Sequence, residues 1–479
     1  MAKPQAWAKE NGSPQSASES IEGIEPHSHA YDPESECVIC RRRRPFEVPP
    51  KLVNACISRD LVVFAGAGVS TESPSVLPWT LFQDVARSVE LDPATTSFPA
   101  AMSAFEDLNG RPALLQLAKD RFDHIDSFPG LRRAASAFHR ELSTLFYVSS
   151  IVTTNWDTYF ETECGATPIV TPKDYAFWGL PGRKVFKLHG SMNNIGSIVA
   201  TEADYEACYE SLREGAIGSS LKHLLATKTI AFVGYSFRDE DFARIYSLIQ
   251  DQLGEMLPRP FIVTLDDDFD ASAFPGATIV TTDAAFFVQE LKRAVREERD
   301  CLLPDEQFNQ LGPLLEEVRD RHLEMTNALA LKTYPLVLYA ACYQDGLMDA
   351  LERALAMRST GTYSHTCDTT AMVRKYEELR KRALRKRDYW DVAYVEGYQN
   401  GMLFLLIDDD ARDAIPLYFA FGADNEPMPD LDAYRKVIER GEKLHKTAYK
   451  RARKVADSFR SDDVVVHHPP LLLGLQSDD

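Results

Sequence analysis

The sequence lacks the segments that would export a protein or hold it in a membrane. Residues 1–20 contain no apolar core of the kind found in signal peptides, and nowhere do about 18 apolar residues follow one another. The eight cysteines are scattered rather than set in a framework, so we expect reduced thiols, with the pair Cys37 and Cys40 as an exception discussed below. These absences predict a cytoplasmic protein without a membrane partner.

Basic residues are few relative to acidic ones, because 53 Lys and Arg face 72 Asp and Glu and leave a net charge of −19. Affinity for nucleic acids depends largely on neutralising phosphates with Lys and Arg. The balance therefore argues against a protein that binds nucleic acid over its whole surface, whereas a local basic face stays open. With 479 residues, of which 44% are hydrophobic, the chain is long enough for about two or three domains.

Three stretches of different texture predict the domain organisation. Residues 1–50 are rich in Ser, Pro, Glu and Gly without periodicity, which predicts a mostly disordered segment. Within residues 51–295, short apolar runs such as "LVVFA", "SSIVTT", "KVFKL" and "TIAFV" alternate with helical patterns. Strands buried on both faces and separated by helices predict a parallel α/β sheet. Residues 300–479 show only helical patterns, which predict a C-terminal all-α domain.

The stretch "LVVFAGAGVSTES" at residues 61–73 ends a predicted buried strand in two glycines, Gly66 and Gly68. Because glycine has no Cβ, its backbone can approach a ligand closely and successive amides can point at an anion, which suits a pyrophosphate. The full G-x-G-x-x-G pattern is absent, so a tight turn between strand and helix explains this stretch equally well when it is taken alone.

Three further polar clusters follow predicted strands. They contain Asn155 and Asp157 in "TTNWD", His189, Gly190 and Ser191 in "KLHGS", and Gly234 and Ser236 in "VGYS". Each has a structural explanation by itself: a helix cap, a core histidine with satisfied hydrogen bonds, and a turn. Ligands of parallel α/β sheets bind beyond the carboxyl ends of the strands. Four polar clusters at four such ends therefore favour a single binding site.

In their order along the chain, "GAGVS", "TTNWD", "LHGS" and "GYS" resemble the Sir2-like (sirtuin-related) NAD-binding domains, over roughly residues 51–295. The resemblance implies a Rossmann-like sheet that binds NAD as substrate. It implies that the turn of Gly66, Ala67 and Gly68 meets the pyrophosphate, that Gly234 and Ser236 lie near the adenosine, and that Ser70 and Gly190 are further binding residues. It also implies that Asn155 and His189 act catalytically at the nicotinamide ribose and that Asp157 meets the nicotinamide carboxamide.

The chemistry of Asn155 and His189 agrees with those implied roles. Cleavage between nicotinamide and ribose leaves an oxocarbenium-like sugar, so the site must hold the ribose and direct a nucleophile to the anomeric carbon. A neutral histidine can accept a proton from water or a ribose hydroxyl near neutral pH. An asparagine can orient that group without titrating, since it carries both a donor and an acceptor.

The sequence departs from the protein-deacylating sirtuins in two places. Those enzymes carry a structural zinc module of two cysteine pairs after the "HG" motif, whereas between Gly190 and Gly234 this chain has only Cys208. It also reads "ESPSVLPWTLF" where they have a run of proline, aspartate, phenylalanine and arginine. These departures favour an NAD glycohydrolase that forms nicotinamide and ADP-ribose. An NAD-dependent protein deacylase and a non-catalytic module that senses NAD or ADP-ribose for a partner remain the alternatives.

The combination of a Sir2-like domain and a helical domain resembles bacterial anti-phage effectors that deplete NAD. That resemblance implies a homo-oligomer and control by the helical domain or by a partner such as a HerA-like ATPase. Two basic stretches, "RKYEELRKRALRKR" and "RKVIERGEKLHKTAYKRARK", lie in the helical part. A solvated helix face with Glu–Lys pairs four residues apart explains them, and a docking surface for an acidic partner or nucleic acid is the alternative.

A further constellation lies in the N-terminal segment. His27 and His29 alternate, and Cys37 and Cys40 have the C-x-x-C spacing of a zinc knuckle, so the four side chains are candidates for a structural zinc site. The neighbouring run from Arg41 to Arg44 is equally well explained as a charged linker.

Overall fold

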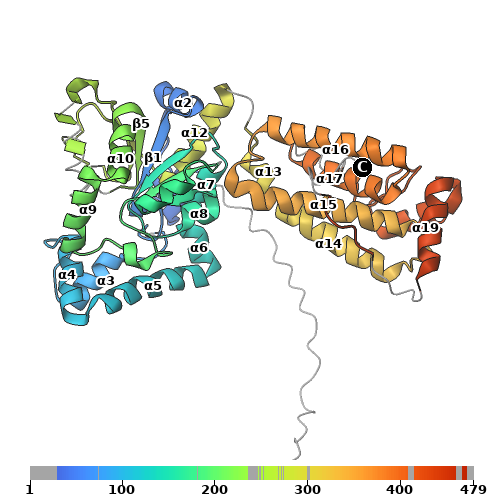
Figure 1. Cartoon of the computed structure of the whole chain (residues 1–479), viewed down its shortest axis with the longest axis horizontal. Coiled ribbons are helices and arrows are strands. Elements are labelled where there is room, and N and C mark those ends of the chain that lie inside the picture. Colours follow the sequence, from blue (N-terminus) through green and yellow to red (C-terminus); the bar gives the residue numbers. More distant parts are fainter. Residues whose placement is uncertain are drawn as a thin grey trace, which may run out of the picture.

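The computed structural model describes residues 30–471 apart from 74, 181, 236–245, 248–249, 252, 268, 271, 273, 299–301, 408–414 and 460–465. The first part of the chain is built around a seven-stranded sheet, and the last part is a set of packed helices beside it (Figure 1). This arrangement confirms the predicted fold class, a parallel α/β sheet followed by an all-α region.

The sheet is parallel throughout and has the strand order β3-β4-β2-β1-β5-β6-β7. Its strands are β1 (Leu61–Ala65), β2 (Ser150–Thr153), β3 (Thr167–Ile169), β4 (Lys184–Lys187), β5 (Thr229–Val233), β6 (Phe261–Thr264) and β7 (Thr278–Thr281). The chain leaves β1 to build one half of the sheet and then crosses to β5 to build the other. The strand order therefore reverses between β1 and β5, where ligands bind in Rossmann-like sheets.

Helices cover both faces of the sheet because successive side chains of a strand point to opposite sides. In β1, Val63 and Ala65 pack with α2 (Pro50–Ile57), α7 (Ala137–Ser143), α8 (Tyr159–Cys164) and α12 (Ala284–Glu298). Val62 and Phe64 pack on the other face with α9 (Glu202–Glu214) and α10 (Ala216–Thr227). All five residues of β1 are buried, which explains why its sequence is continuously apolar.

Four helices between β1 and β2 lie at the carboxyl edge of the sheet: α3 (Leu81–Ser88), α4 (Phe98–Asn109), α5 (Arg111–Ser127) and α6 (Pro129–Ala135) (Figure 1). Thr80 begins α3 with a capping box, in which its hydroxyl accepts from the Gln83 amide. Val85, Met102 and Leu114 form an apolar cluster with Trp156, which belongs to the loop after β2. The helices therefore rest directly on the loops that carry the predicted site residues.

Residues 30–50 pack against the β7 edge of the sheet, although the sequence predicts a mostly disordered segment there. Val38–Arg42 forms the short helix α1, and the Asp283 amide donates to the Arg42 carbonyl at 3.0 Å. Phe46 stacks on Phe287 of α12 with ring centroids 5.9 Å apart. Burial of Phe46 together with Val48 against the sheet's apolar cluster explains the order of a segment that shows no periodicity.

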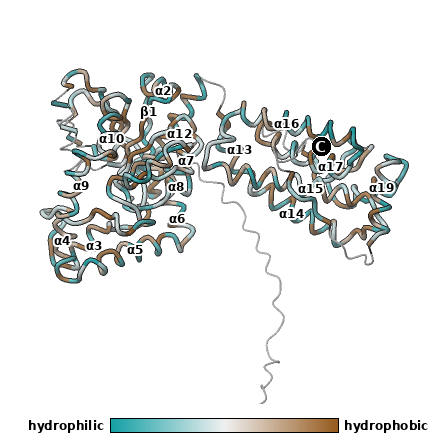
Figure 2. The backbone as a smooth tube through the Cα atoms, in the orientation of Figure 1, coloured by the Kyte–Doolittle hydropathy of each residue, from teal (hydrophilic) through white to brown (hydrophobic). Residues whose placement is uncertain are grey.

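The all-α region contains α13 (Asp305–Asn309), α14 (Leu311–Ala328), α15 (Val337–Met357), α16 (Thr366–Lys386), α17 (Tyr389–Phe404), α18 (Leu431–Ile438) and α19 (Lys446–Ser458). Hydrophobic residues run through α15 and α17, which form the centre of one apolar core (Figure 2). The two helices touch at Gly346 and Gly397, because a Cβ at either glycine would lie within 2.0 Å of a backbone oxygen of the other helix. Only glycine permits this approach.

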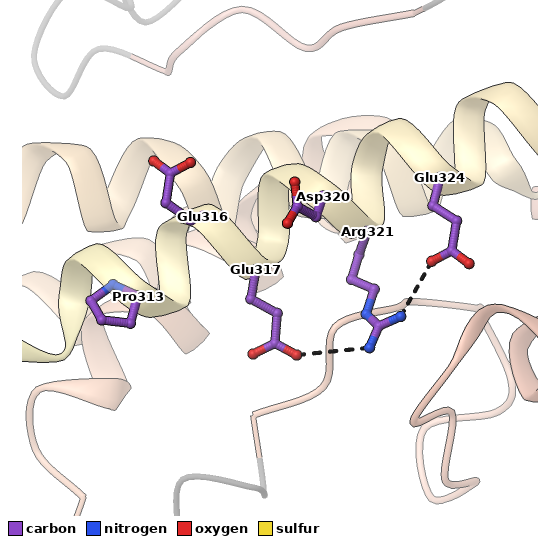
Figure 3. Close-up of a pocket in the computed structure, with 6 residues that line it drawn as sticks. All are labelled: Pro313, Glu316, Glu317, Asp320, Arg321 and Glu324. Atoms are coloured by element: carbon purple, nitrogen blue, oxygen red, sulfur yellow. Dashed lines mark hydrogen bonds and ion pairs between the residues drawn. The ribbon is translucent and has the colours of Figure 1, made fainter. Parts of the chain in front are cut away.

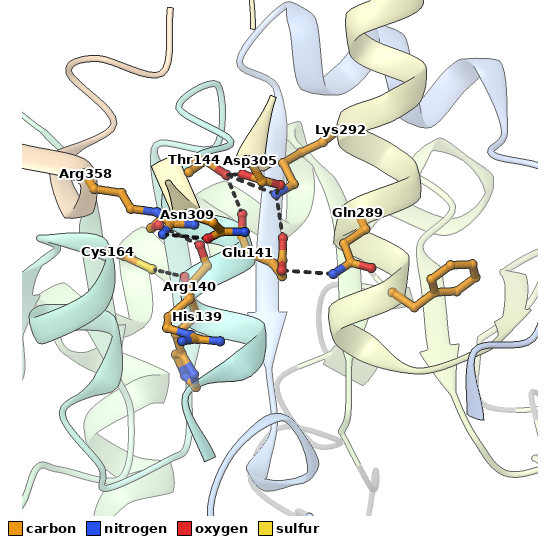
Figure 4. A network of polar contacts seen from close by, with 12 residues as sticks. His139, Arg140, Glu141, Thr144, Cys164, Gln289, Lys292, Asp305, Asn309 and Arg358 are labelled. Atoms are coloured by element: carbon orange, nitrogen blue, oxygen red, sulfur yellow. Dashed lines mark hydrogen bonds and ion pairs between the residues drawn. The ribbon is translucent and has the colours of Figure 1, made fainter. Parts of the chain in front are cut away.

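A buried polar network joins the two parts (Figure 4). The Lys292 ammonium of α12 donates to Glu141 at 2.6 Å, to Thr144 at 3.0 Å, and to Asp305 of α13. Burial raises the pKa of Asp305, but its ion pair with Lys292 outweighs this effect and holds the pKa below its usual value. The carboxylate is therefore ionised at neutral pH and fixes α13 to α12.

Among the described helices, none combines the length and the apolar character that spanning a membrane requires.

Candidate functional site

The sheet brings the predicted site residues to one edge. Thr153 at the end of β2 pairs with Ala65 of β1 on one side and with Lys187 of β4 on the other, and Ala65 also pairs with Val233 of β5. Neighbouring strands lie about 4.8 Å apart. Asn155 and His189 each follow these paired positions by two residues, so they lie on adjacent loops. The Leu188 amide also donates to the Thr153 carbonyl at 2.9 Å, which ties those loops together.

Asn155 is held rigidly and only 6% exposed. Its side-chain amide donates to the Gly66 carbonyl at 3.0 Å and to the Ser70 hydroxyl at 3.3 Å, and its backbone amide donates to Thr153 Oγ1 at 3.0 Å. Since Gly66 offers only an acceptor, the NH₂ group must face it and Oδ1 must face the other way. Within the described part of the chain, this buried oxygen has no hydrogen-bond partner. It is an acceptor ready for a hydroxyl or a water.

Asp157 positions Ser70 rather than facing an empty space. Its Oδ2 accepts from the Ser70 hydroxyl at 2.8 Å, and its Oδ1 accepts from the Tyr159 amide at 3.1 Å. Because the Ser70 proton points to Asp157, the Ser70 oxygen accepts from Asn155. Asp157, Ser70 and Asn155 thus form a buried chain of hydrogen bonds that fixes the Asn155 amide.

His189 is 4% exposed, and its ring meets Tyr205 of α9 edge to face at 4.9 Å. Its carbonyl accepts from the Val199 amide at 3.1 Å. Gly190 has φ +85°, and a Cβ there would lie 2.1 Å from the Ser197 carbonyl oxygen, so this turn requires glycine. The next residue, Ser191, is buried, and its hydroxyl has no partner among the described residues. A second buried polar group without a hydrogen-bond partner among the described residues therefore lies two residues after His189.

The glycine turn after β1 differs in detail from its sequence-based explanation. The Gly66 amide donates to the Val233 carbonyl, and the Gly68 amide donates to the Gly234 carbonyl, both at 3.0 Å. These two amides are therefore already used within the protein, contrary to the expectation that they point at an anion. The glycines are required by close packing, since a Cβ on Gly66 would lie 2.5 Å from the Gly234 oxygen. Ala67 and Gly68 are the exposed residues of the turn.

Gly234 completes this contact from β5. It has φ +59°, and a Cβ there would meet Val69 at 2.7 Å, so the loops after β1 and β5 interlock through glycines on both sides. Ser236 follows two residues later but lies outside the described residues, as do His27 and His29 of the predicted metal site.

Cys37 and Cys40 lie at the start of α1 and form no disulfide. The Cys40 backbone donates a hydrogen bond that lowers the pKa of the Cys37 thiol, and the two thiol groups interact. Burial raises the pKa of Cys40. The two cysteines are thus close to each other and lie near β7, an edge strand of the sheet. In sequence they are remote from the site residues.

Several polar residues that support the site were missed by sequence reasoning. Lys187, the last residue of β4, is 1% exposed, donates to the Asp157 carbonyl and pairs with Glu161 at 3.2 Å. A lysine inside an apolar strand was the available signal. Burial raises the pKa of Glu161, and Lys187 opposes this shift. Lys187 therefore holds the loop that carries Asp157 in place from the end of the neighbouring strand β4.

Glu72 and Arg121 fix the segment after the glycine turn. Arg121 of α5 is 8% exposed, pairs with Glu72 at 3.1 Å and donates to the Trp79 carbonyl at 2.8 Å. Glu72 also accepts from the Leu81 amide at 2.7 Å, at the start of α3. Burial raises the pKa of Glu72, against the effect of Arg121. The part of the "ESPSVLPWTLF" stretch that precedes α3 is thus anchored to Arg121 at Glu72 and at Trp79.

The basic helices are partly neutralised within the chain. On α16, Lys381 pairs with Glu378 at 3.1 Å and with Glu377 at 3.6 Å, and on α19 Arg453 pairs with Asp457 at 3.2 Å. These pairs agree with the interpretation of a solvated helix face.

A surface hollow of about 470 Å³ lies elsewhere, on α14 (Figure 3). It is lined by Pro313, Glu316, Glu317, Asp320, Arg321 and Glu324. Arg321 is engaged by Glu324 at 3.2 Å, so the hollow presents mainly carboxylates. Such a lining repels a pyrophosphate, and the hollow is no candidate for the NAD site.

A known family matches part of the sheet region, from the residue before β2 to the first residue of β7. Residues 149–278 match the family described as SIR2-like domain. The match includes Asn155, Asp157, His189 and Gly234, whereas the glycine turn at 66–68 precedes it.

Three curated relatives share part of the chain. A protein named NAD(+) hydrolase ThsA of Cytobacillus dafuensis is 32% identical over 200 residues, which are 40% of this chain and 38% of that protein. Another of that name, of Enterococcus faecium, is 32% identical over 203 residues, or 40% of each chain. Defense-associated sirtuin 2 of Bacillus subtilis is 22% identical over 217 residues, or 43% of this chain and 21% of that protein. The chain thus spans about two fifths of the first two relatives.

Proposed function

We propose that the SIR2-like domain of this chain is an NAD⁺ glycohydrolase that cleaves NAD⁺ to nicotinamide and ADP-ribose. The observation that carries the proposal is the orientation of Asn155, whose buried Oδ1 has no partner among the described residues and lies on the loop next to that of His189. The similarity to two proteins named NAD(+) hydrolase supports the same substrate.

In this proposal Asn155 orients the nucleophile. A water or a ribose hydroxyl donates to its Oδ1, which replaces the missing hydrogen bond and fixes the direction of the nucleophile's lone pairs. The amide group cannot rotate to offer its NH₂ instead, because the Gly66 carbonyl and the Ser70 oxygen hold that group. Asp157 acts through Ser70 and is in this scheme a positioning residue, in addition to its implied contact with the nicotinamide carboxamide.

His189 is the proposed general base. When the bond between nicotinamide and the ribose breaks, its electron pair leaves with nicotinamide and the anomeric carbon becomes electron-poor. The water oxygen bonds to that carbon, and the proton of the water passes to His189 and then to solvent. The contact with Tyr205 holds the imidazole in place during this transfer.

The exposed turn at Ala67 and Gly68 remains the proposed contact of the pyrophosphate, with Gly190, Gly234 and Ser236 around the rest of the dinucleotide. The explanation differs from the sequence-based one, because the Gly66 and Gly68 amides are both occupied within the protein. Gly66 then contributes by letting β1 and β5 approach each other at the switch point.

We also propose that the enzyme acts in anti-phage defence, in the cytoplasm, as a homo-oligomer whose activity the helical region or a HerA-like ATPase controls. The name of the Bacillus subtilis relative, a defense-associated sirtuin, supports the setting. Unrestrained NAD⁺ hydrolysis would poison the producing cell, which supports a requirement for control. The Lys292 network is a physical connection between the two parts.

A structural zinc ion at the N-terminal segment is a further part of the proposal. The proximity of the Cys37 and Cys40 thiols suits two neighbouring ligands of one ion.

The proposal is tested by incubating the full chain with NAD⁺ alone, with an acylated peptide, and with the products of neighbouring genes, and by measuring nicotinamide. We expect peptide-independent release. His189→Ala and Asn155→Ala should each lower the rate by about 10² to 10⁴-fold while the proteins stay folded. His223→Ala, on the exposed face of α10, is the matched control and should keep the full rate.

Release that requires the acylated peptide would instead identify a deacylase. Binding of NAD⁺ without release under any of these conditions would leave a sensing module and overturn the enzyme.

A further inference from the structure

Three residues from separate segments meet in the helical region, far in sequence from the proposed NAD site. They are His322 of α14, Asp345 of α15 and His467 of the C-terminal segment 466–471. One ring nitrogen from each histidine and one carboxylate oxygen of Asp345 all lie within 4.8 Å of one another. The two imidazole rings face each other at 5.2 Å with an angle of 18° between their planes.

The neighbours of His322 fix its tautomer. The Gln344 side-chain amide donates to the Leu417 carbonyl at 2.9 Å, so its Oε1 faces His322 as an acceptor. His322 Nδ1 lies 3.1 Å from that oxygen and therefore carries the hydrogen. Nε2 is left with its lone pair. It is buried, and among the described residues it has no hydrogen-bond partner.

Asp345 is also held in place. It is 6% exposed, and its Oδ2 accepts from the His468 backbone amide at 2.7 Å, while Oδ1 lies 3.0 Å from His467 Nδ1. His468 itself is anchored, because its ring stacks on Tyr394 at 4.4 Å and contacts Asp391 at 3.0 Å. The C-terminal segment is thus docked firmly enough to present His467 at one place.

We propose that His322, Asp345 and His467 bind one divalent transition-metal cation, for which Zn²⁺ is the representative ion. Two imidazoles and a carboxylate are a ligand set that such cations prefer, with the remaining positions open to water. Gln344 and the His468 amide supply the outer hydrogen bonds that orient ligands in metal sites. The ion would fasten the C-terminal segment to α14 and α15.

Closing the site requires the His467 ring to turn, because two nearly parallel stacked rings cannot both direct their in-plane lone pairs at one ion. Zinc lies about 2.0–2.1 Å from histidine nitrogens, so the three donors must approach one another more closely than the 4.8 Å limit that encloses them here. The His467 side chain is 60% exposed and can turn inward without disturbing the core. An ion pair between Asp345 and His467 explains the docking of the segment, but it leaves the buried Nε2 of His322 without a hydrogen-bond partner among the described residues.

The test uses the full chain without a polyhistidine tag, treated with EDTA and then freed of it. Zinc is titrated by calorimetry, and Co²⁺ is added separately to record the visible absorption of a bound ion. The variants are His467→Ala, whose exposed side chain can be removed without opening the core, and His322→Gln. His223→Ala on α10 is the matched control, because it removes an equally exposed histidine from outside the cluster.

We expect the His467→Ala and His322→Gln chains to bind one equivalent of zinc fewer than the wild type, or to bind that equivalent about 10- to 100-fold more weakly. Zinc should raise the thermal unfolding midpoint of the wild type and of His223→Ala more than that of His467→Ala. The same stoichiometry and affinity in His467→Ala as in the wild type would overturn the site. Nicotinamide release is not the readout, so failure here leaves the proposed hydrolase untouched.

Discussion

Two places in this molecule are built on glycines that let backbones touch, yet they differ in what surrounds them. At the carboxyl edge of the sheet, Gly66 lies against Gly234 and Tyr235. In the helical region, Gly346 and Gly397 let α15 lie against α17. The first contact borders Asn155, whose NH₂ group donates to Gly66 and whose buried Oδ1 has no partner in the described chain. The second lies in an apolar core of tyrosines and aliphatic side chains.

Close approach of two backbones through glycine therefore does not by itself identify a ligand site. Packing alone explains the glycines of both regions. At the sheet edge the glycine also holds a polar side chain, since the Gly66 carbonyl accepts from the Asn155 amide and leaves its buried Oδ1 without a partner among the described residues. Such an atom carries a desolvation cost unless a ligand or water meets it, so the edge glycine serves to position that oxygen.

Among the variants that separate the two glycine contacts, Gly66→Ala should have the largest effect. The new Cβ would lie 2.5 Å from the Gly234 oxygen and 2.5 Å from Tyr235 Cα, both of them backbone atoms, so the two loops must separate. Because the Gly66 carbonyl holds Asn155, the separation moves the proposed nucleophile-orienting group, and kcat for NAD⁺ hydrolysis should fall about 100-fold. The kcat of the variant is measured by steady-state kinetics of nicotinamide release.

The matched control is Gly130→Ala on α6, where a Cβ meets nothing within 4 Å. That variant should keep the wild-type kcat. An equal kcat in Gly66→Ala would show that the edge glycine has no part in positioning Asn155.

The second effect separates the helical contact from the edge. A Cβ at Gly397 would lie 1.8 Å from the Tyr343 carbonyl oxygen, so Gly397→Ala should force α15 and α17 apart and lower the free energy of unfolding by about 3 kcal/mol. Urea unfolding followed by circular dichroism measures the loss. Gly312→Ala on α14, with open space around it, should cost nothing and gain up to about 1 kcal/mol from helix propensity. Equal stability of the two variants would contradict the close contact.

The smallest expected effect concerns the hydrogen bonds that hold Asn155 at the carboxyl edge of the sheet. Ser70→Ala removes the hydroxyl between Asp157 and Asn155 and leaves Asp157 Oδ2 buried without that donor. We expect a loss of about 1 kcal/mol in unfolding free energy and about a tenfold fall in kcat, since Asn155 keeps its bond to Gly66. Ser75→Ala, at an exposed position, is the control. A loss of stability with unchanged kcat would make Ser70 purely structural.

Much of the fold could be predicted from the sequence because the strands are buried on both faces. "LVVFA", "SIVT", "KVFK" and "TIAFV" are short apolar runs between helical patterns, and each became a strand of the parallel sheet. The order of residues 38–48 was not predictable in this way, because it depends on Phe46 stacking on Phe287 of α12, which lies more than 200 residues further along the chain.

The residue types at the ends of the strands could be identified from the sequence, because the apolar runs end there and glycine, asparagine and histidine begin. What each of these residues does depends on the tertiary structure. Strand order placed β4, β2, β1 and β5 side by side, and that order depends on long-range packing. It turned the Gly66 and Gly68 amides toward β5 and left the Asn155 oxygen without a partner among the described residues. Hydrogen bonds between distant segments are satisfied pair by pair in three dimensions, so no local pattern could reveal which polar atoms would remain for a ligand.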